Sequence, residues 1–194
     1  MTGQIPDAMR YAGEDYSLVG VNGGPLFEPA TYGLTAGVLS TACWRGYVAT
    51  YGLSGDRLIL SDLEIGLLDE DRNYIPVAGA PPLFGTPPSA SDHIATAPFY
   101  RGLAEPIAFT GELLLGRDFV DDLYVHMGFQ DAWKYREVHR LTFETGRLVS
   151  AADQSAEAAR HRADPPPPPP NPHDRQAVED WIKGTFDQRF DPPA

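Results

Sequence analysis

The chain has 194 residues, enough for one domain with a sizeable core, and 42% of them are hydrophobic, which excludes general disorder. Its formal net charge of −12 disfavours binding to nucleic acid or to anionic membranes. A single cysteine, Cys43, excludes an internal disulfide framework, and no apolar run approaches the roughly 18 residues of a membrane span. Because residues 1–10 also lack the pattern of a secretory signal, we expect a cytoplasmic protein.

Two short strands are expected near the N-terminus, over residues 9–12 and 15–21, joined by a tight turn at Gly13 and Glu14. Glycine permits the backbone conformation that a tight turn requires. The sequence therefore begins with a predicted hairpin.

The strongest strand pattern covers residues 41–51, in which aromatic and β-branched side chains predominate. Gly46 in the middle of this run predicts a bulge or a close approach of two backbone segments. A turn at residues 54–56 is followed by a second alternating run at 57–68. Together they predict a long antiparallel hairpin.

The segment 69–105 contains many prolines and is expected to be irregular. Strand patterns resume at residues 107–115, 123–129 and 135–143, the last followed by a turn and a short returning strand. The predicted fold is therefore mainly β, an antiparallel sheet or barrel-like arrangement, with a short C-terminal helix. It becomes an α+β fold if that helix packs on the sheet.

The composition changes after residue 150, which divides the chain into a β-rich domain at 1–150 and a tail at 151–194. The tail begins with a polar helical segment that has almost no apolar stripe, so it is expected to be solvated. Residues 165–170 are all proline and predict a polyproline II spacer. An amphipathic helix is expected at 175–186, and the tail is expected to add little to the stability of the first domain.

Histidine, arginine and glutamate side chains offer one possible catalytic set. In a strand at 123–129, His126 faces away from the core, beside Tyr124. If neighbouring strands bring His126 together with Arg45 and Glu64, the three residues could perform general acid–base chemistry or bind an anion. The same residues are equally typical of a salt-bridged sheet surface, with the histidine half-buried and bonded to a carbonyl group.

The sequence predicts no metal site and no cofactor. None of the five histidines is spaced as a ligand pair, and Cys43 is the sole cysteine. The carboxylates at Asp118, Asp121 and Asp122 lack the ligand spacing of a calcium loop, so they are interpreted as a solvated turn.

Several segments resemble a family of uncharacterised bacterial β-rich proteins. They include Trp44-Arg45-Gly46-Tyr47 and Tyr124-Val125-His126-Met127-Gly128, within a likeness that covers roughly residues 9–150. The resemblance implies a bacterial, cytosolic, β-rich protein and implies no particular activity.

The acidity, the small size and the lack of a catalytic motif favour a protein that binds a partner, most concretely an immunity protein or inhibitor that occludes a toxin or enzyme. The expected partner is a basic protein. The side chains expected at the interface are acidic ones that steer this partner and aromatic ones that anchor it, namely Asp62, Glu64, Asp69, Glu70, Asp71, Tyr47 and Tyr124. Two alternatives stay open: a small hydrolase or ligand-processing enzyme that uses His126, and an adaptor that recruits partners through its polyproline segment.

Overall fold

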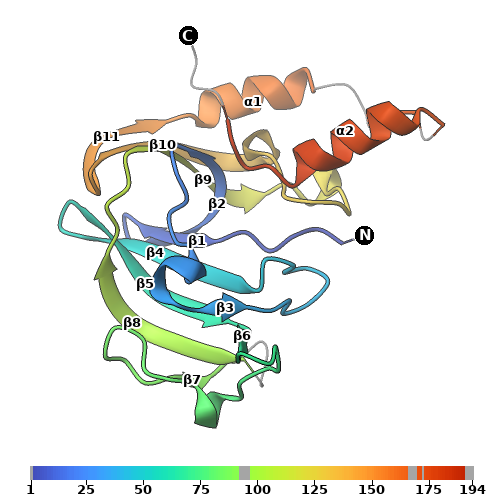
Figure 1. Ribbon diagram of the computed structural model, residues 1–194. Helices are drawn as coiled ribbons and strands as arrows, with labels where there is room; N and C mark the ends of the chain where they lie inside the picture. Colours follow the sequence, from blue (N-terminus) through green and yellow to red (C-terminus); the bar gives the residue numbers. More distant parts are fainter. Residues whose placement is uncertain (1, 92–96, 166–169, 172, 191–194) are drawn as a thin grey trace.

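The computed structural model describes residues 2–91, 97–165, 170–171 and 173–190, and it confirms a mainly β fold (Figure 1). The strands are β1 (Ala8–Tyr11), β2 (Glu14–Asn22), β3 (Thr35–Ala36), β4 (Tyr47–Ser54), β5 (Arg57–Ile65), β6 (Leu67–Leu68), β7 (Ser89–Ala90), β8 (Pro98–Pro106), β9 (Gly111–Phe119), β10 (Tyr135–Glu144) and β11 (Arg147–Asp153). Two α-helices follow, α1 (Ser155–Ala163) and α2 (Arg175–Thr185). No helix of the described residues is long and apolar enough to cross a membrane.

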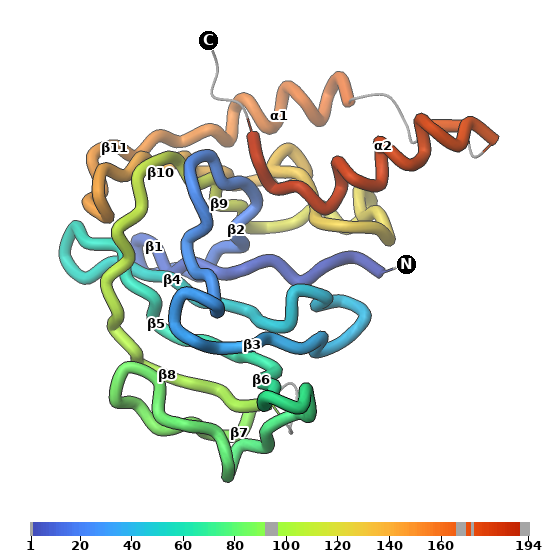
Figure 2. Tube along the Cα trace, in the orientation of Figure 1, coloured from blue at the N-terminus to red at the C-terminus, as the bar shows by residue number. Residues whose placement is uncertain are grey.

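One large sheet has the strand order β11-β10-β9-β2-β1-β4-β5-β8-β7, and β3 pairs with β6 in a small second sheet. The large sheet is mixed, because β1 runs parallel to β4, whereas the other pairs of neighbouring strands in the described part of the sheet are antiparallel. It also curls until β11 meets β5, where Arg147 pairs with Arg57 and Leu148 N–H donates to the carbonyl of Asp56. Seven strands thus form a ring, which agrees with the barrel-like prediction (Figure 2).

The core fills the inner side of this ring. Strand residues alternate between the two faces of a sheet, so every second side chain of the long strands points to the interior. The largest fully buried side chains are Met9, Leu18, Tyr51, Leu58, Leu60, Leu63, Ile65, Tyr100, Leu113, Leu115, Leu141 and Phe143.

The predicted N-terminal hairpin is confirmed as β1 and β2, and the predicted hairpin at 41–68 is confirmed in part. β4 starts at Tyr47 rather than at residue 41, because the backbone turns sharply before it. Gly46 has φ +83°, and a Cβ there would lie 2.4 Å from the carbonyl oxygen of Gly37. The predicted close backbone approach at Gly46 is therefore correct, and it is what ends the strand.

Two predictions between residues 69 and 129 are wrong. β8, at Pro98–Pro106, lies in the segment expected to be irregular; its prolines stand at the strand ends, where they interrupt few ladder bonds. The segment 123–129 forms no strand, because Gly128 takes φ +59° against the carbonyl of Thr185. The side chain of Gln130 also binds both backbone groups of Val125, which would otherwise pair with a neighbouring strand.

The segment beyond residue 150 is attached to the sheet. β11 continues to Asp153, and α1 packs on the outside of β10 through the buried side chain of Ala158. Most other residues of α1 are exposed, as expected for a helix without an apolar stripe. The N-terminal end of α2 is capped by Asp174, and its C-terminal end meets the 125–130 loop, where Phe129 N–H donates to the carbonyl of Thr185. Residues 166–169 of the predicted polyproline spacer lie outside the described part of the chain.

Candidate functional site

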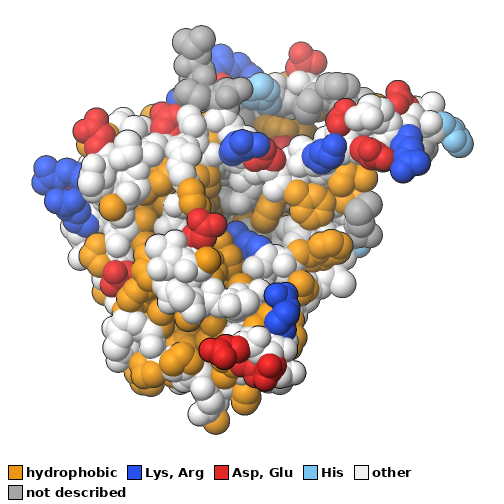
Figure 3. Space-filling model, in the orientation of Figure 1, with side chains coloured by type: hydrophobic (Ala, Val, Ile, Leu, Met, Phe, Trp, Pro, Cys, Tyr) orange, Lys and Arg blue, Asp and Glu red, His pale blue; other side chains and the backbone are white. Residues whose placement is uncertain are grey.

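Large apolar side chains gather at one end of the ring, on segments that are hydrogen-bonded to one another. We call this set the exposed aromatic surface; it consists of Ile5, Val38, Trp44, Tyr74 and Tyr124, each 44–58% exposed. The N-terminal segment and the loop before β4 lie on the right-hand side of Figure 1, and hydrophobic side chains are exposed along the same side of the space-filling view (Figure 3).

Backbone contacts join the segments that carry these side chains. Ile5 N–H donates to the carbonyl of Ala42, and Gln4 N–H donates to the carbonyl of Gly128, close to Tyr124. The hydroxyl of Tyr74 donates to the carbonyl of Val38 at 2.6 Å. The segments that carry these side chains are therefore neighbours in space, although they are distant in sequence.

Trp44 is the most exposed of the large aromatic residues in this set, together with Tyr74, yet its position is fixed. Its indole Nε1–H donates to the carbonyl of Thr41 at 2.7 Å, and its backbone N–H donates to Oε1 of Gln4 at 3.3 Å. The amide of Gln4 also donates to the carbonyl of Thr41 at 3.0 Å. The side chain is thus held in place before any partner arrives, which lowers the entropic cost of binding.

An acidic turn stands beside this surface. Asp69, Glu70 and Asp71 are exposed in the turn that leads from β6 to Tyr74, and Leu68 pairs with Tyr74 across it. These three acidic residues of the sequence-predicted interface therefore lie in the turn next to Tyr74 of the exposed aromatic surface. Tyr124 of the same prediction belongs to the surface itself.

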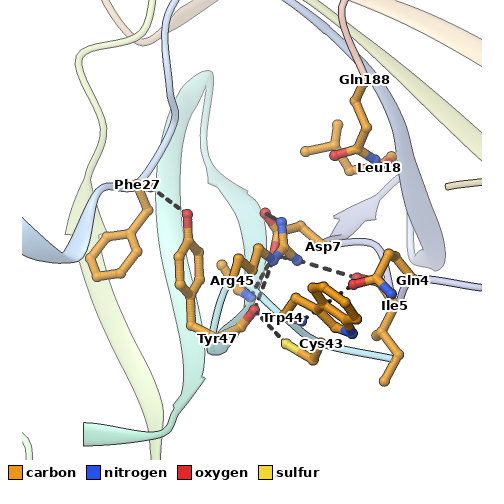
Figure 4. Close-up of polar contacts among 11 residues, drawn as sticks. Gln4, Ile5, Asp7, Leu18, Phe27, Cys43, Trp44, Arg45, Tyr47 and Gln188 are labelled. Atoms are coloured by element: carbon orange, nitrogen blue, oxygen red, sulfur yellow. Dashed lines mark hydrogen bonds and ion pairs between the residues drawn. The ribbon is translucent and has the colours of Figure 1, made fainter. Parts of the chain in front are cut away.

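Beneath the loop that carries Trp44 lies an ion pair between Arg45 and Asp7 (Figure 4). The guanidinium donates to Oδ1 of Asp7 at 2.6 Å and to Oδ2 at 3.1 Å, and its Nε donates to the carbonyl of Tyr47 at 2.8 Å. Oδ1 of Asp7 also accepts the N–H of Ala49 at 2.7 Å. The pair therefore joins the N-terminal segment, the Trp44 loop and β4.

Burial sets the protonation of the groups around this ion pair. Desolvation raises the pKa of Asp7, although the charge of Arg45 works against this shift. Desolvation also raises the pKa of Cys43, whose thiol donates to the carbonyl of Tyr47. The pKa of Tyr47 rises to about 12 for the same reason, and its hydroxyl donates to the carbonyl of Phe27 at 3.0 Å. Cys43 is therefore a buried thiol that keeps its proton, and Tyr47 is half-buried, with its hydroxyl held by Phe27.

The three residues proposed as a catalytic set form no hydrogen bond or ion pair with each other within the described residues. Arg45 is occupied by Asp7, and His126 is exposed on its loop with Tyr124, whose hydroxyl lies 3.4 Å from Nδ1. Glu64 is buried in β5 between its neighbours in β4 and β8, with Oε1 unpaired. Asp62 is buried as well, and its Oδ2 lies 2.9 Å from Nη1 of Arg10, so neither acidic side chain of β5 is presented to a partner.

A polar network that the sequence did not reveal surrounds Glu137 on β10. Its carboxylate accepts the hydroxyl of Tyr16 at 2.5 Å and Nε of Arg117 at 2.8 Å, and it lies 3.0 Å from Nε2 of His139. The hydrogen bond from Tyr16, followed by the contact with His139, lowers the pKa of Glu137 to about 2. Only strand pairing across β2, β9 and β10 brings these residues together, so no local sequence pattern signals the network.

No group of three or more potential metal ligands occurs among the residues that the structure describes. Comparison with known proteins finds no matching family model, no similar curated protein and no similar solved structure.

Proposed function

We propose that this protein binds a basic protein partner without turnover, in the manner of an immunity protein or inhibitor that occludes its target. The observation that carries this proposal is the exposed aromatic surface, which gathers five large apolar side chains at one end of the fold. Aromatic side chains dominate binding energy at protein interfaces, and tryptophan and tyrosine are the commonest anchors.

Two further features support a protein partner. Trp44 is held by a hydrogen bond to its own loop and Tyr74 by one to the carbonyl of Val38, as expected for anchors that are ordered in the free protein. The exposed carboxylates of Asp69, Glu70 and Asp71, together with the net charge of −12, favour association with a positively charged surface.

The enzyme alternative has less support, because Arg45 is committed to Asp7 and contacts neither His126 nor Glu64. The adaptor alternative depends on a polyproline run of which residues 166–169 are not described. The following experiments separate the enzyme alternative from partner binding.

The test compares immobilised wild-type protein with Trp44→Ala and Val149→Ala in capture from extracts of the source cell. Val149 is the matched control, because it is 48% exposed on β11 and does not belong to the exposed aromatic surface. We expect the wild type and the Val149 variant to retain the same protein, and we expect Trp44→Ala to lower its affinity at least about 30-fold, the effect of losing about 2 kcal/mol. Equal affinity for all three proteins contradicts the proposal.

Charge and catalysis are tested on the captured protein. Replacement of Asp69, Glu70 and Asp71 by their amides is expected to slow association more than it speeds dissociation, and added salt is expected to mask the difference. His126→Ala is expected to change affinity only modestly. If instead no protein is retained while a small molecule is turned over, and His126→Ala stops this turnover, the enzyme alternative replaces the binding proposal.

A further inference from the structure

A cavity of about 300 Å³ opens onto the core on the inner side of the ring, next to the ion pair of Arg45 and Asp7. Leu18, Phe27 and Tyr51, which all belong to the hydrophobic core, form part of its wall. Its volume is about twice that of an engineered cavity of roughly 150 Å³ that holds benzene. Figure 4 shows Leu18 and Gln188 on one side of the ion pair of Arg45 and Asp7, and Tyr47 and Phe27 on the other.

The segment after α2 forms the opposite wall of this cavity. The side-chain amide of Gln188 donates to the carbonyl of Leu18 at 2.8 Å, and its backbone carbonyl accepts the N–H of Val21 at 2.8 Å. Two hydrogen bonds to β2 therefore hold residues 187–189 at the rim of the cavity, which stays open to solvent on one side.

Tyr51 places a polar group in this pocket without a partner. Its side chain is 1% exposed, and its hydroxyl forms no hydrogen bond with any described residue. The hydroxyl is not among the inaccessible polar atoms that lack a partner, so it is reachable from the pocket, where a ligand or a water can accept its hydrogen bond. Burial raises the pKa of Tyr51 well above its usual value, so the phenol keeps its proton and is available as a donor.

Arg45 offers a second donor at the same place. A guanidinium has five N–H groups, and four hydrogen bonds are formed here, to Tyr47, Ile5 and the two oxygens of Asp7. One N–H of Nη1 is left over. Two donors thus line a pocket whose remaining wall is largely apolar.

The charges around the pocket cancel. Its charged lining residues form two ion pairs, Arg45 with Asp7 and Arg189 with Asp187. No net charge is left to attract an ion, whereas an uncharged oxygen acceptor matches the two free donors.

We propose that this pocket binds a small uncharged molecule with an apolar body and a carbonyl-type oxygen, which accepts a hydrogen bond from Tyr51. The site is separate from the exposed aromatic surface, although Arg45 connects the two through the loop that carries Trp44. Ligand binding in this pocket is therefore tested independently of the proposed protein partner.

The test uses acetophenone and ethylbenzene, which share an apolar body of similar size and differ in the carbonyl oxygen. Both are titrated into isotope-labelled full-length protein and into Tyr51→Phe, with binding followed by amide chemical shifts. The wild type is expected to bind acetophenone saturably, with shifts around Leu18, Phe27 and Tyr51. In Tyr51→Phe the ratio of acetophenone to ethylbenzene affinity is expected to fall about fivefold to tenfold, the effect of one lost hydrogen bond.

Tyr51→Phe removes only an unpartnered hydroxyl, so its thermal unfolding should match that of the wild type or occur at a higher temperature. Three results overturn the proposal: no saturable binding of acetophenone, an affinity ratio that is unchanged in Tyr51→Phe, or shifts that map instead to another cavity, such as the one between α1 and β10. None of these results affects the proposed partner surface, which is tested by Trp44→Ala.

Discussion

Replacement of Asp7 by asparagine is the sharpest test of how the exposed aromatic surface is held. Asparagine keeps the shape of the side chain and an acceptor for Ala49 N–H, but it removes the charge that faces Arg45. The Arg45 side chain is 24% exposed and Asp7 is nearly inaccessible, so water can solvate only part of the guanidinium that is left unpaired. Breaking a buried ion pair costs about 3–5 kcal/mol, and the partial exposure of Arg45 reduces this to about 2–3 kcal/mol.

For a chain of this size, such a loss lowers the midpoint of thermal unfolding by about 5–10 °C. The matched control is Asp56→Asn. Its ion pair with Arg147 has the same closest distance, 2.6 Å, but the two side chains are 48% and 61% exposed. Exposed pairs contribute about 0–1 kcal/mol, so the control is expected to shift the midpoint by no more than a few degrees.

The measurement is the free energy of unfolding of the two variants and the wild type by chemical denaturation. Because Arg45 also binds the carbonyl of Tyr47 beside the Trp44 loop, Asp7→Asn is further expected to weaken partner binding, whereas Asp56→Asn is not. If Asp7→Asn costs no more than Asp56→Asn, the ion pair does not organise this end of the fold, and the reasoning is refuted.

Two further predictions concern the Glu137 network and the tail. The pKa of Glu137 is about 2 in the folded protein, against an ordinary value of 4.5. As the pH is lowered, the carboxylate is therefore protonated first in the unfolded chain. The free energy of unfolding consequently falls between about pH 4.5 and about pH 2. Glu137→Gln is expected to flatten this pH dependence in acid-unfolding experiments, whereas Glu144→Gln, on an exposed position of the same strand, is expected to leave it intact. Truncation after Asp153 removes α1, the buried side chain of Ala158 and the hydrogen bonds that Arg162 donates to the carbonyls of Trp133 and Tyr135. It is expected to lower the free energy of unfolding, measured with a denaturant, by about 2–4 kcal/mol. An unchanged unfolding midpoint would instead support a tail that is dispensable to residues 1–150.

Local sequence patterns were sufficient to predict the elements whose signal lies within a few residues. Alternation and turn chemistry predicted the first hairpin, β5 and β10, and the apolar spacing of Val178, Trp181 and Ile182 predicted α2. Gly46 was correctly expected at a close backbone approach. Where local signals conflicted with long-range contacts, the predictions were wrong: prolines concealed β8, and the aromatic run before β4 is a turn that presents Trp44 to solvent.

Only the tertiary structure decided which polar side chains meet. Asp7 and Arg45 are 38 residues apart, Tyr16 and Glu137 are 121 apart, and the pocket of Tyr51 is lined on one side by residues that follow α2. Such pairings depend on strand order and register, and here they include one parallel pair and a ring closed at Arg147 and Arg57. Periodicity fixes which face a side chain occupies within its own strand, whereas the partner across the sheet is chosen by packing of the whole core.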